Sequence, residues 1–230
     1  MRTFDILSAC RAAIVLAAAA FAVSCGTKTP TEQFIQSKFD QYADSSKVNQ
    51  LVFVCWYNHE SDAEIMMYER DGRKWKETLA CPGFIGRNGL SANRHAGDKT
   101  TPIGDFGIVE SFGLKENPGT SLPYFVVEDH HWCCGDSVAY NRIIDIRDCP
   151  HHCEGEHLID YDPAYNYSIF FDFNKECVLG KGSAIFFHCY SSRRYTSGCV
   201  AVSEDDMKKI MMSVDMGARI IIQDFPALSY

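Results

Sequence analysis

The 230-residue sequence has no hydrophobic run long enough to cross a membrane as a helix. Its longest apolar stretch, AAIVLAAAAFAV at residues 12–23, falls short of the about 20 residues that the hydrocarbon layer requires. Basic residues are too few for a nucleic-acid surface, because 22 Lys and Arg stand against 30 Asp and Glu and the net charge is −8. The sequence also has no Gly-rich phosphate loop and no flavin or haem signature, so we predict no cofactor.

The N-terminus has the pattern of an export signal. Arg2 and Arg11 precede the short apolar run, and this arrangement predicts that residues 1–24 direct export and are removed. Ala22-Val23-Ser24-Cys25 resembles a lipobox, in which Cys25 would be lipidated and become the first residue of the mature chain. We therefore expect an exported lipoprotein of the periplasm or cell envelope, attached to the membrane only through that lipid. Ordinary cleavage nearby, with Cys25 an incidental thiol, is the alternative.

The remaining chain is expected to form a short tether, one helix and one β-rich domain. Residues 25–47 contain a polar tether and then apolar residues at helical spacing, which predicts an amphipathic helix packed on the domain. Over residues 48–230 the apolar segments shorten to strand length, as in QLVFVCWYN and EIMMYERD, with turn signals between them. The fold class is therefore expected to be mainly β, with a few short helices, in a single domain.

Residues 180–212 hold the strongest candidate for chemistry. The apolar segment AIFFHCY carries His188, and Cys199 follows in a tight Ser197-Gly198-Cys199 turn. An imidazole beside a thiol can accept its proton and keep the sulfur anionic near neutral pH, which is the minimum equipment of a cysteine nucleophile. The alternative is that Cys199 is a structural thiol and His188 a satisfied core histidine.

Several segments resemble the YkuD-type L,D-transpeptidases of bacterial cell walls. In that family a His on a strand precedes a Ser/Thr-x-Gly-Cys segment, which here is Thr196-Ser197-Gly198-Cys199. The family's upstream Gly-Asp-x-x-Thr-Pro-x-Gly matches residues 97–104 without a gap, and Tyr140-Asn141-Arg142 resembles a further family feature. Ser197 and Ala201 depart from the usual His and Arg or Asn at those positions, so the groups that orient the acyl acceptor differ from the family pattern.

The resemblance implies a YkuD-like β-sandwich or barrel-like catalytic domain and a peptidoglycan L,D-transpeptidase. Cys199 would attack a carbonyl of a tetrapeptide stem and form an acyl-enzyme, while His188 would accept the thiol proton and pass it to the leaving amine. As in family members, a backbone carbonyl, of Gly182 or Ser183, would orient the imidazole. The backbone N–H groups of Gly198 and Cys199 would face the oxyanion.

Four further residues are predicted to bind the stem peptide. Arg193 and Arg194 could clamp its carboxylates, although two solvated loop charges are the alternative. Thr101 and Gly104 belong to the upstream motif, whose turns suit a substrate-binding lip.

The acceptor of the acyl group would define the reaction. An amine from a neighbouring stem peptide or from an envelope protein gives transpeptidation, which we favour on family frequency. Water instead gives an L,D-carboxypeptidase or a detaching peptidase. A different class of hypothesis is a non-catalytic cell-wall-binding module, in which Cys199 would be blocked or unreactive.

Residues 130–157 hold four of the eleven cysteines and five of the eight histidines. Exported chains meet oxidising conditions, so we favour disulfides here, with Cys133 or Cys134 joined to Cys149 or Cys153. Metal binding, through Cys149-Pro-His-His-Cys153, and free thiols are the alternatives. Eight cysteines remain when the signal, lipid and nucleophile positions are set aside, and an even number permits complete pairing. No metal is assigned to the catalytic site.

Overall fold

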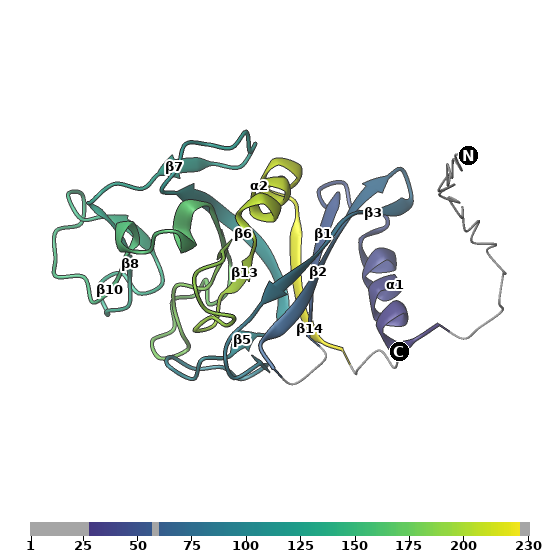
Figure 1. The fold of residues 1–230 in the computed structure, drawn as a ribbon, viewed down its shortest axis with the longest axis horizontal. Helices are drawn as coiled ribbons and strands as arrows, with labels where there is room; N and C mark the ends of the chain where they lie inside the picture. The colour runs from purple at the N-terminus through teal and green to yellow at the C-terminus, as the bar shows by residue number, and fades with distance from the viewer. Residues whose placement is uncertain (1–27, 57–59, 226–230) are drawn as a thin grey trace, which may run out of the picture.

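The computed structural model describes residues 28–56 and 60–225. The predicted export signal and the lipidation site at Cys25 lie outside the described residues. Strands dominate the described chain (Figure 1), which confirms the mainly β fold class. The elements are α1 (Pro30–Tyr42), β1 (Gln50–Trp56), β2 (Asp62–Asp71), β3 (Lys74–Phe84), β4 (Leu90–Ser91), β5 (Thr101–Pro102), β6 (Gly104–Gly113), β7 (Tyr124–Val126), β8 (His131–Cys134), β9 (Ile143–Asp145), β10 (Gly155–His157), the 3-10 helices η1 (Leu158–Asp160) and η2 (Ala164–Asn166), β11 (Ser168–Phe171), β12 (Phe186–Cys189), β13 (Val200–Val202), α2 (Glu204–Ser213) and β14 (Arg219–Asp224).

One large sheet forms the body of the domain. Its strand order is β11-β12-β13-β3-β2-β1-β14-β6-β7, and β6 also pairs with β11. Because of that additional pairing the sheet closes on itself, as the predicted barrel-like domain requires. A separate three-stranded sheet, in the order β10-β8-β9, lies at the end of the molecule away from α1 (Figure 1). Neither α-helix in the described ranges is long and apolar enough to span a bilayer.

Strand β1 is buried on both faces, which explains its nearly continuous apolar sequence. Val52 and Val54 point into the central core, where they belong to the same cluster as Met207 of α2. Leu51 and Phe53 point to the opposite face and belong to the cluster that α1 covers. The alternation follows from the two-residue period of a strand, and it gives each face of β1 a separate apolar cluster.

The predicted amphipathic helix is present as α1. It begins at Pro30 because Thr29 and Glu32 form a capping box, in which each side chain accepts a hydrogen bond from the other residue's backbone N–H. Asp105 of β6 anchors the helix to the sheet, since its carboxylate lies 2.9 Å from the Lys38 ammonium and 2.8 Å from Nε of Arg219.

The parallel pair β12 and β13 positions the candidate residues. Phe187 of β12 packs in the central core, whereas Phe186 points to the other face, into a cluster that includes Cys199. His188 shares the face of Phe186 and lies opposite Ala201, two residues beyond Cys199. The register of this pair therefore brings the imidazole and the thiol to the same end of the sheet.

Helix α2 follows β13 directly. Ser203 is its N-cap, and the Ser203 hydroxyl accepts a hydrogen bond from the Asp206 N–H.

Among the cysteines of residues 28–56 and 60–225, one pair is bonded. The sulfurs of Cys134 and Cys153 are bonded to one another, and this pair is among those that the sequence analysis favours. Complete pairing of the eight candidate cysteines does not occur, because most of the others lie on separate strands in apolar surroundings or apart on loops. The six that remain thiols are Cys55, Cys81, Cys133, Cys149, Cys177 and Cys189.

Candidate active site

Cys199 and His188 line the same cavity, which has a volume of about 290 Å³. Its wall also includes Glu156 from β10 and two aromatic side chains, Tyr161 and Tyr165, from the segment that follows. The Tyr165 ring lies edge-on to the imidazole, with 5.5 Å between ring centroids. The cavity is therefore built where the large sheet meets the three-stranded sheet.

The imidazole of His188 is oriented by a backbone carbonyl, but not by a predicted one. Its Nδ1 lies 2.7 Å from the carbonyl oxygen of Cys189. A carbonyl can only accept, so Nδ1 carries the proton and Nε2 is the basic nitrogen. The prediction of Gly182 or Ser183 for this role is wrong, because Cys189 supplies the carbonyl and that of Gly182 accepts a hydrogen bond from Asn174 Nδ2 at 2.9 Å.

The thiol of Cys199 is held by the backbone that precedes β12. Its Sγ donates to the carbonyl oxygen of Ala184 at 3.2 Å and accepts from the Phe186 N–H at 3.3 Å. Ala184 has a φ of +54°, an uncommon conformation for a residue with a Cβ. Among the hydrogen bonds of the described residues, none joins the Cys199 thiol to the His188 imidazole. The S–H would have to leave the Ala184 carbonyl and turn toward the imidazole before a proton could pass between them.

Burial keeps both groups uncharged. It raises the pKa of the Cys199 thiol to about 12, and it lowers the pKa of His188 to about 4. At neutral pH the resting pair is therefore a thiol and a neutral imidazole. The expected anionic sulfur is wrong for the resting site, because a buried charge loses its hydration and neither group has a close hydrogen-bonding counter-ion.

Glu156 places an acidic group in the cavity; the sequence shows a resemblance to the family in the Gly155-Glu156-His157-Leu158 segment but assigns no role to this carboxyl. Burial raises its pKa to about 7, although the hydrogen bond that it accepts from the Tyr165 hydroxyl opposes this shift. Its negative charge, when present, adds to the effect of burial on the pKa of Cys199. Glu156 reaches the site because β10 pairs with β8, where it lies opposite Cys133. No local motif signals that long-range pairing.

The turn before Cys199 is braced by two threonines. Thr196 Oγ1 donates to the Cys199 carbonyl oxygen at 2.6 Å and accepts from the Gly198 N–H at 3.0 Å. Thr101 Oγ1 lies 3.3 Å from the same carbonyl oxygen. The Gly198 N–H, predicted to face the oxyanion, thus has a hydrogen-bond partner within the turn in this structure. Gly198 has a φ of +145°, and a Cβ there would lie 3.0 Å from the carbonyl oxygen of Thr100, which explains the glycine.

The residues predicted to bind substrate are only partly on the cavity wall. Arg193 lines it, as does Ser197, which was predicted with the catalytic turn and not as a substrate-binding residue. Arg194 lies outside it, and its Nη2 is 3.3 Å from a carboxylate oxygen of Asp62. Thr101 is fully buried beneath the turn, so it supports the Cys199 backbone instead of contacting a ligand. Gly104 also lies off the wall, because it begins β6 and pairs with β14.

Arg94 lies behind the nucleophile and was not signalled by any motif. Its side chain is only 4% exposed, and its nearest acidic group is Asp98 at 3.7 Å. The guanidinium fills the space between two glycines: a Cβ would lie 2.8 Å from Nη1 at Gly182 and 3.3 Å from Nη2 at Gly198. Its positive charge opposes the effect of burial on the pKa of Cys199. The lack of side chains at these glycines thus lets a cation approach the nucleophile from behind.

One tyrosine and one asparagine side chain fix the loop before β12. The Tyr140 hydroxyl accepts from the Gly182 N–H at 3.0 Å, and Asn141 Oδ1 accepts from the Ala184 N–H at 3.1 Å. Both residues belong to the Tyr140-Asn141-Arg142 segment noted in the sequence. Their role is therefore to position the backbone that holds the Cys199 sulfur.

Known proteins that resemble this chain come from two comparisons. Solved structures that resemble the chain include Bd1075 of Bdellovibrio bacteriovorus (15% identity, TM-score 0.44, 78% of this chain and 49% of that one) and L,D-transpeptidase 1 of Mycobacterium tuberculosis (13% identity, TM-score 0.38, 76% and 61%). The chain thus spans about half to three fifths of the length of these proteins. No curated protein matches it. The family model of the YkuD L,D-transpeptidase catalytic domain matches residues 59–222, and the chain therefore belongs to that family.

Proposed function

We propose that the protein is a peptidoglycan L,D-transpeptidase with Cys199 as nucleophile and His188 as general base. The observation that supports this most directly is that both side chains line one cavity, with the imidazole held in the tautomer whose Nε2 can accept a proton. A non-catalytic wall-binding module has no need for that combination. Membership of the family supports peptidoglycan stem peptides as the substrate class.

The reaction would begin from the neutral pair. The Cys199 thiol leaves the Ala184 carbonyl, turns to His188, and gives its proton to Nε2 as the sulfur attacks the stem-peptide carbonyl. Proton transfer and attack then occur together, so no free thiolate has to exist in the buried site. The backbone N–H of Cys199 is our choice of donor to the oxyanion, since that of Gly198 is occupied.

Collapse of the tetrahedral intermediate breaks the C–N bond of the scissile peptide. His188 returns its proton to the departing amine, and the acyl group remains on the Cys199 sulfur as a thioester. An acceptor amine then attacks the thioester, gives its proton to the imidazole, and the thiol is restored. Arg193, at the cavity wall, is positioned to bind a carboxylate of one of the two peptides.

The test is intact-protein mass spectrometry with a tetrapeptide stem. We expect a covalent acyl adduct, with loss of the terminal D-amino acid, and no adduct on Cys199→Ala. Cys177→Ala is the matched control because Cys177 is also a free thiol but lies outside the cavity. Turnover by Cys199→Ala, or loss of the adduct in Cys177→Ala, would contradict the assignment.

Product analysis on defined muropeptides tests the acceptor. Cross-linked dimers are expected when an amine-bearing stem is supplied. If tripeptide is the product at every concentration of acceptor amine and no dimer forms, water is the acceptor and the protein is an L,D-carboxypeptidase.

A further inference from the structure

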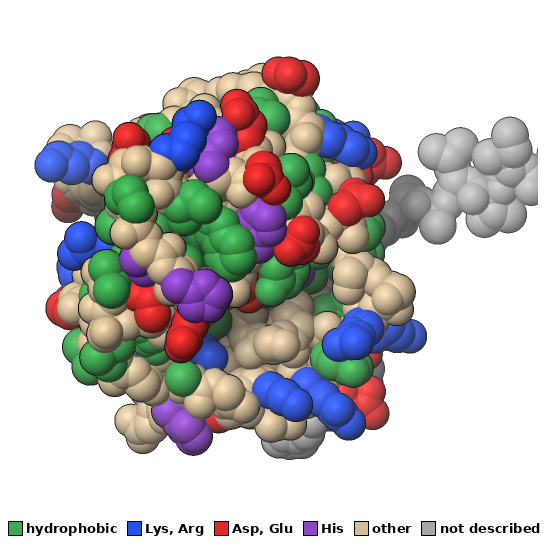
Figure 2. Space-filling model, turned by 90° about the vertical axis from the view of Figure 1, so that its left-hand side faces the viewer, with side chains coloured by type: hydrophobic (Ala, Val, Ile, Leu, Met, Phe, Trp, Pro, Cys, Tyr) green, Lys and Arg blue, Asp and Glu red, His purple; other side chains and the backbone are tan. Residues whose placement is uncertain are grey.

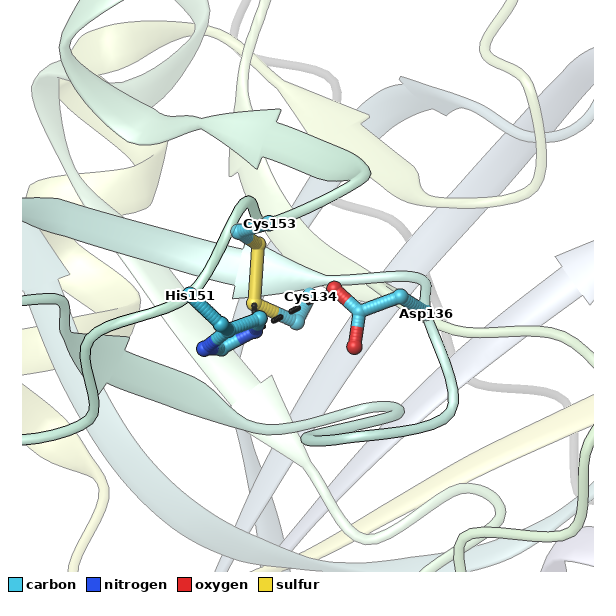
Figure 3. A group of neighbouring side chains, drawn as sticks. All are labelled: Cys134, Asp136, His151 and Cys153. Atoms are coloured by element: carbon cyan, nitrogen blue, oxygen red, sulfur yellow. Dashed lines mark hydrogen bonds and ion pairs between the residues drawn. A yellow bond between two sulfur atoms is a disulfide. The ribbon is translucent and has the colours of Figure 1, made fainter.

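A second cluster of chemically active side chains lies on the three-stranded sheet, outside the catalytic cavity. Cys134 ends β8, Asp136 follows it, and His151 and Cys153 precede β10 (Figure 3). One ligand-type atom from each residue lies within 4.8 Å of the others. Histidine and acidic side chains gather on this face of the molecule (Figure 2).

The tautomer of His151 directs a lone pair into the cluster. Its Nδ1 lies 2.8 Å from the backbone carbonyl oxygen of Cys149, so Nδ1 is the nitrogen that carries a proton. In the neutral ring Nε2 is then an acceptor, and it lies 3.6 Å from Cys134 Sγ and 3.3 Å from Asp136 Oδ2. In that state three electron-rich atoms face one another, an arrangement that a cation stabilises, whether a proton on Nε2 that pairs with Asp136 or a metal ion. A ring N–H donated to a backbone carbonyl is also the usual support of a metal-ligating histidine.

The distances agree with the edges of a zinc tetrahedron. Zinc lies about 2.3 Å from thiolate sulfur and about 2.0–2.2 Å from imidazole nitrogen and carboxylate oxygen, so tetrahedral edges are about 3.6 Å for N to S and about 3.4 Å for N to O. The observed distances from His151 Nε2 are 3.6 Å to Cys134 Sγ and 3.3 Å to Asp136 Oδ2. These are two of the six edges, and a third, between the sulfurs of Cys134 and Cys153, is shorter than a zinc site requires because the two atoms are bonded to one another in the structure.

The carboxylate is held in place by the backbone. Asp136 Oδ1 accepts from the Val138 N–H at 2.8 Å, and Oδ2 accepts from the Glu154 N–H at 3.1 Å. A carboxylate oxygen has two lone pairs, so Oδ2 keeps one for a metal. The pair of bonds fixes the direction of that lone pair before any ion binds.

We propose that the chain with reduced Cys134 and Cys153 binds one Zn²⁺ through their two sulfurs, His151 Nε2 and Asp136 Oδ2. Two thiolates and an imidazole suit zinc and do not suit Mg²⁺ or Ca²⁺. Four protein ligands complete a tetrahedron, so the site is structural and takes no part in acyl transfer. It therefore goes beyond the proposed function and does not depend on it.

The two states of the cluster exclude one another. Zinc binding to the dithiol releases two protons and transfers no electrons, with two Zn–S bonds formed. The disulfide lacks both thiolates, and it becomes the zinc-binding form only after a dithiol reductant supplies two electrons and is itself oxidised to a disulfide. The site would hold β8 to the segment before β10 in either state, since Cys134 and Cys153 are joined by the metal or by the S–S bond.

The test measures Zn²⁺ affinity of the full chain, prepared reduced and free of metal, by competition with a chromophoric chelator. We expect one zinc per chain, and a Co²⁺-loaded form with thiolate-to-metal charge-transfer absorption. His151→Gln should lower the affinity at least a hundredfold while it keeps both cysteines. His130→Gln is the matched control, because His130 belongs to the neighbouring His130, His131 and Asp145 group.

The proposal is overturned if the reduced chain binds no zinc, if His151→Gln binds it as tightly as the unchanged chain, or if His130→Gln loses it instead. Tight binding by the oxidised chain would also refute it. His151→Gln can still form the disulfide, so circular dichroism of its oxidised form shows whether the fold is intact. A lower zinc affinity of that variant then reports the loss of a ligand and not the loss of the fold.

Discussion

Replacement of Glu156 by Gln should change how the stability of the protein depends on pH. Glu156 is a carboxyl in the cavity beside Cys199, and burial raises its pKa to about 7 from an ordinary 4.5. Gln keeps the shape and can still accept the hydrogen bond of the Tyr165 hydroxyl, but it has no charge. The variant therefore removes one titration from the folded state with little change in packing.

The sign and size follow from the two pKa values. Below pH 4.5 the carboxyl is neutral in both the folded and unfolded chains, and its contribution to stability is fully present. As the pH rises toward 7, the unfolded chain releases the proton while the folded chain retains it, so the free energy of unfolding falls. A shift of 2.5 pH units at about 1.4 kcal/mol each is about 3 kcal/mol. Solvent in the cavity screens part of the charge, so we expect the free energy of unfolding to fall by about 2–3 kcal/mol over this pH range.

Four acidic groups whose pKa values the charge of Glu156 raises do not themselves change charge in this interval. Burial raises the pKa values of Tyr161, Tyr165, Cys133 and Cys199, so all four stay neutral. Urea unfolding of both proteins from pH 4 to pH 8.5 measures the effect. The unchanged chain should lose about 2–3 kcal/mol relative to Glu156→Gln between pH 4.5 and 8. Parallel curves for the two proteins would show that the carboxyl is solvated and that the reasoning is wrong.

Three further changes probe the supports of the site. Arg94→Met removes the buried cation behind Cys199 and should raise the thiol pKa, seen as slower alkylation of Cys199 at alkaline pH; an unchanged rate would show that the guanidinium does not act on the sulfur. Gly198→Ala should lower the free energy of unfolding by about 1–3 kcal/mol and slow the acylation of Cys199. Gly97→Ala is its control, because Gly97 also has a positive φ but an added Cβ would meet no atom within 4 Å, and Cys199 of this variant should be acylated at the normal rate. Asp105→Asn should destabilise by about 1–3 kcal/mol in urea unfolding because Lys38 and Arg219 lose their shared partner, whereas the exposed Asp44→Asn should have almost no effect.

Local sequence pattern was sufficient for much of the fold. The period-two apolar segments became β1 and β2, and Ser203 with Asp206 marked the start of α2. These features depend on contacts between residues close in the chain, which the sequence contains directly. The sequence also singled out Cys199 and His188 as candidates, and both line one cavity in the structure.

Protonation and support of the site could not be predicted in this way. A thiol and an imidazole in sequence suggest an ion pair, yet burial between two sheets makes the neutral pair the resting form. Gly198 stands in the motif, but the Thr196 hydroxyl takes its N–H. Arg94 and Glu156 reach Cys199 only through distant pairing of chain segments.

The sequence by itself determined the strand-rich domain, the one helix on its outer face, and the residue types available for thiol chemistry. Only the tertiary structure decided which of those residues share a cavity, which backbone carbonyl orients His188, and which cysteines meet near His151. The physical reason is that alternation and capping act over a few residues, whereas desolvation and hydrogen-bond partners depend on every segment that packs around a group. Closure of the large sheet brings those segments together, and the strand pairing that closes it cannot be predicted from a short stretch of sequence.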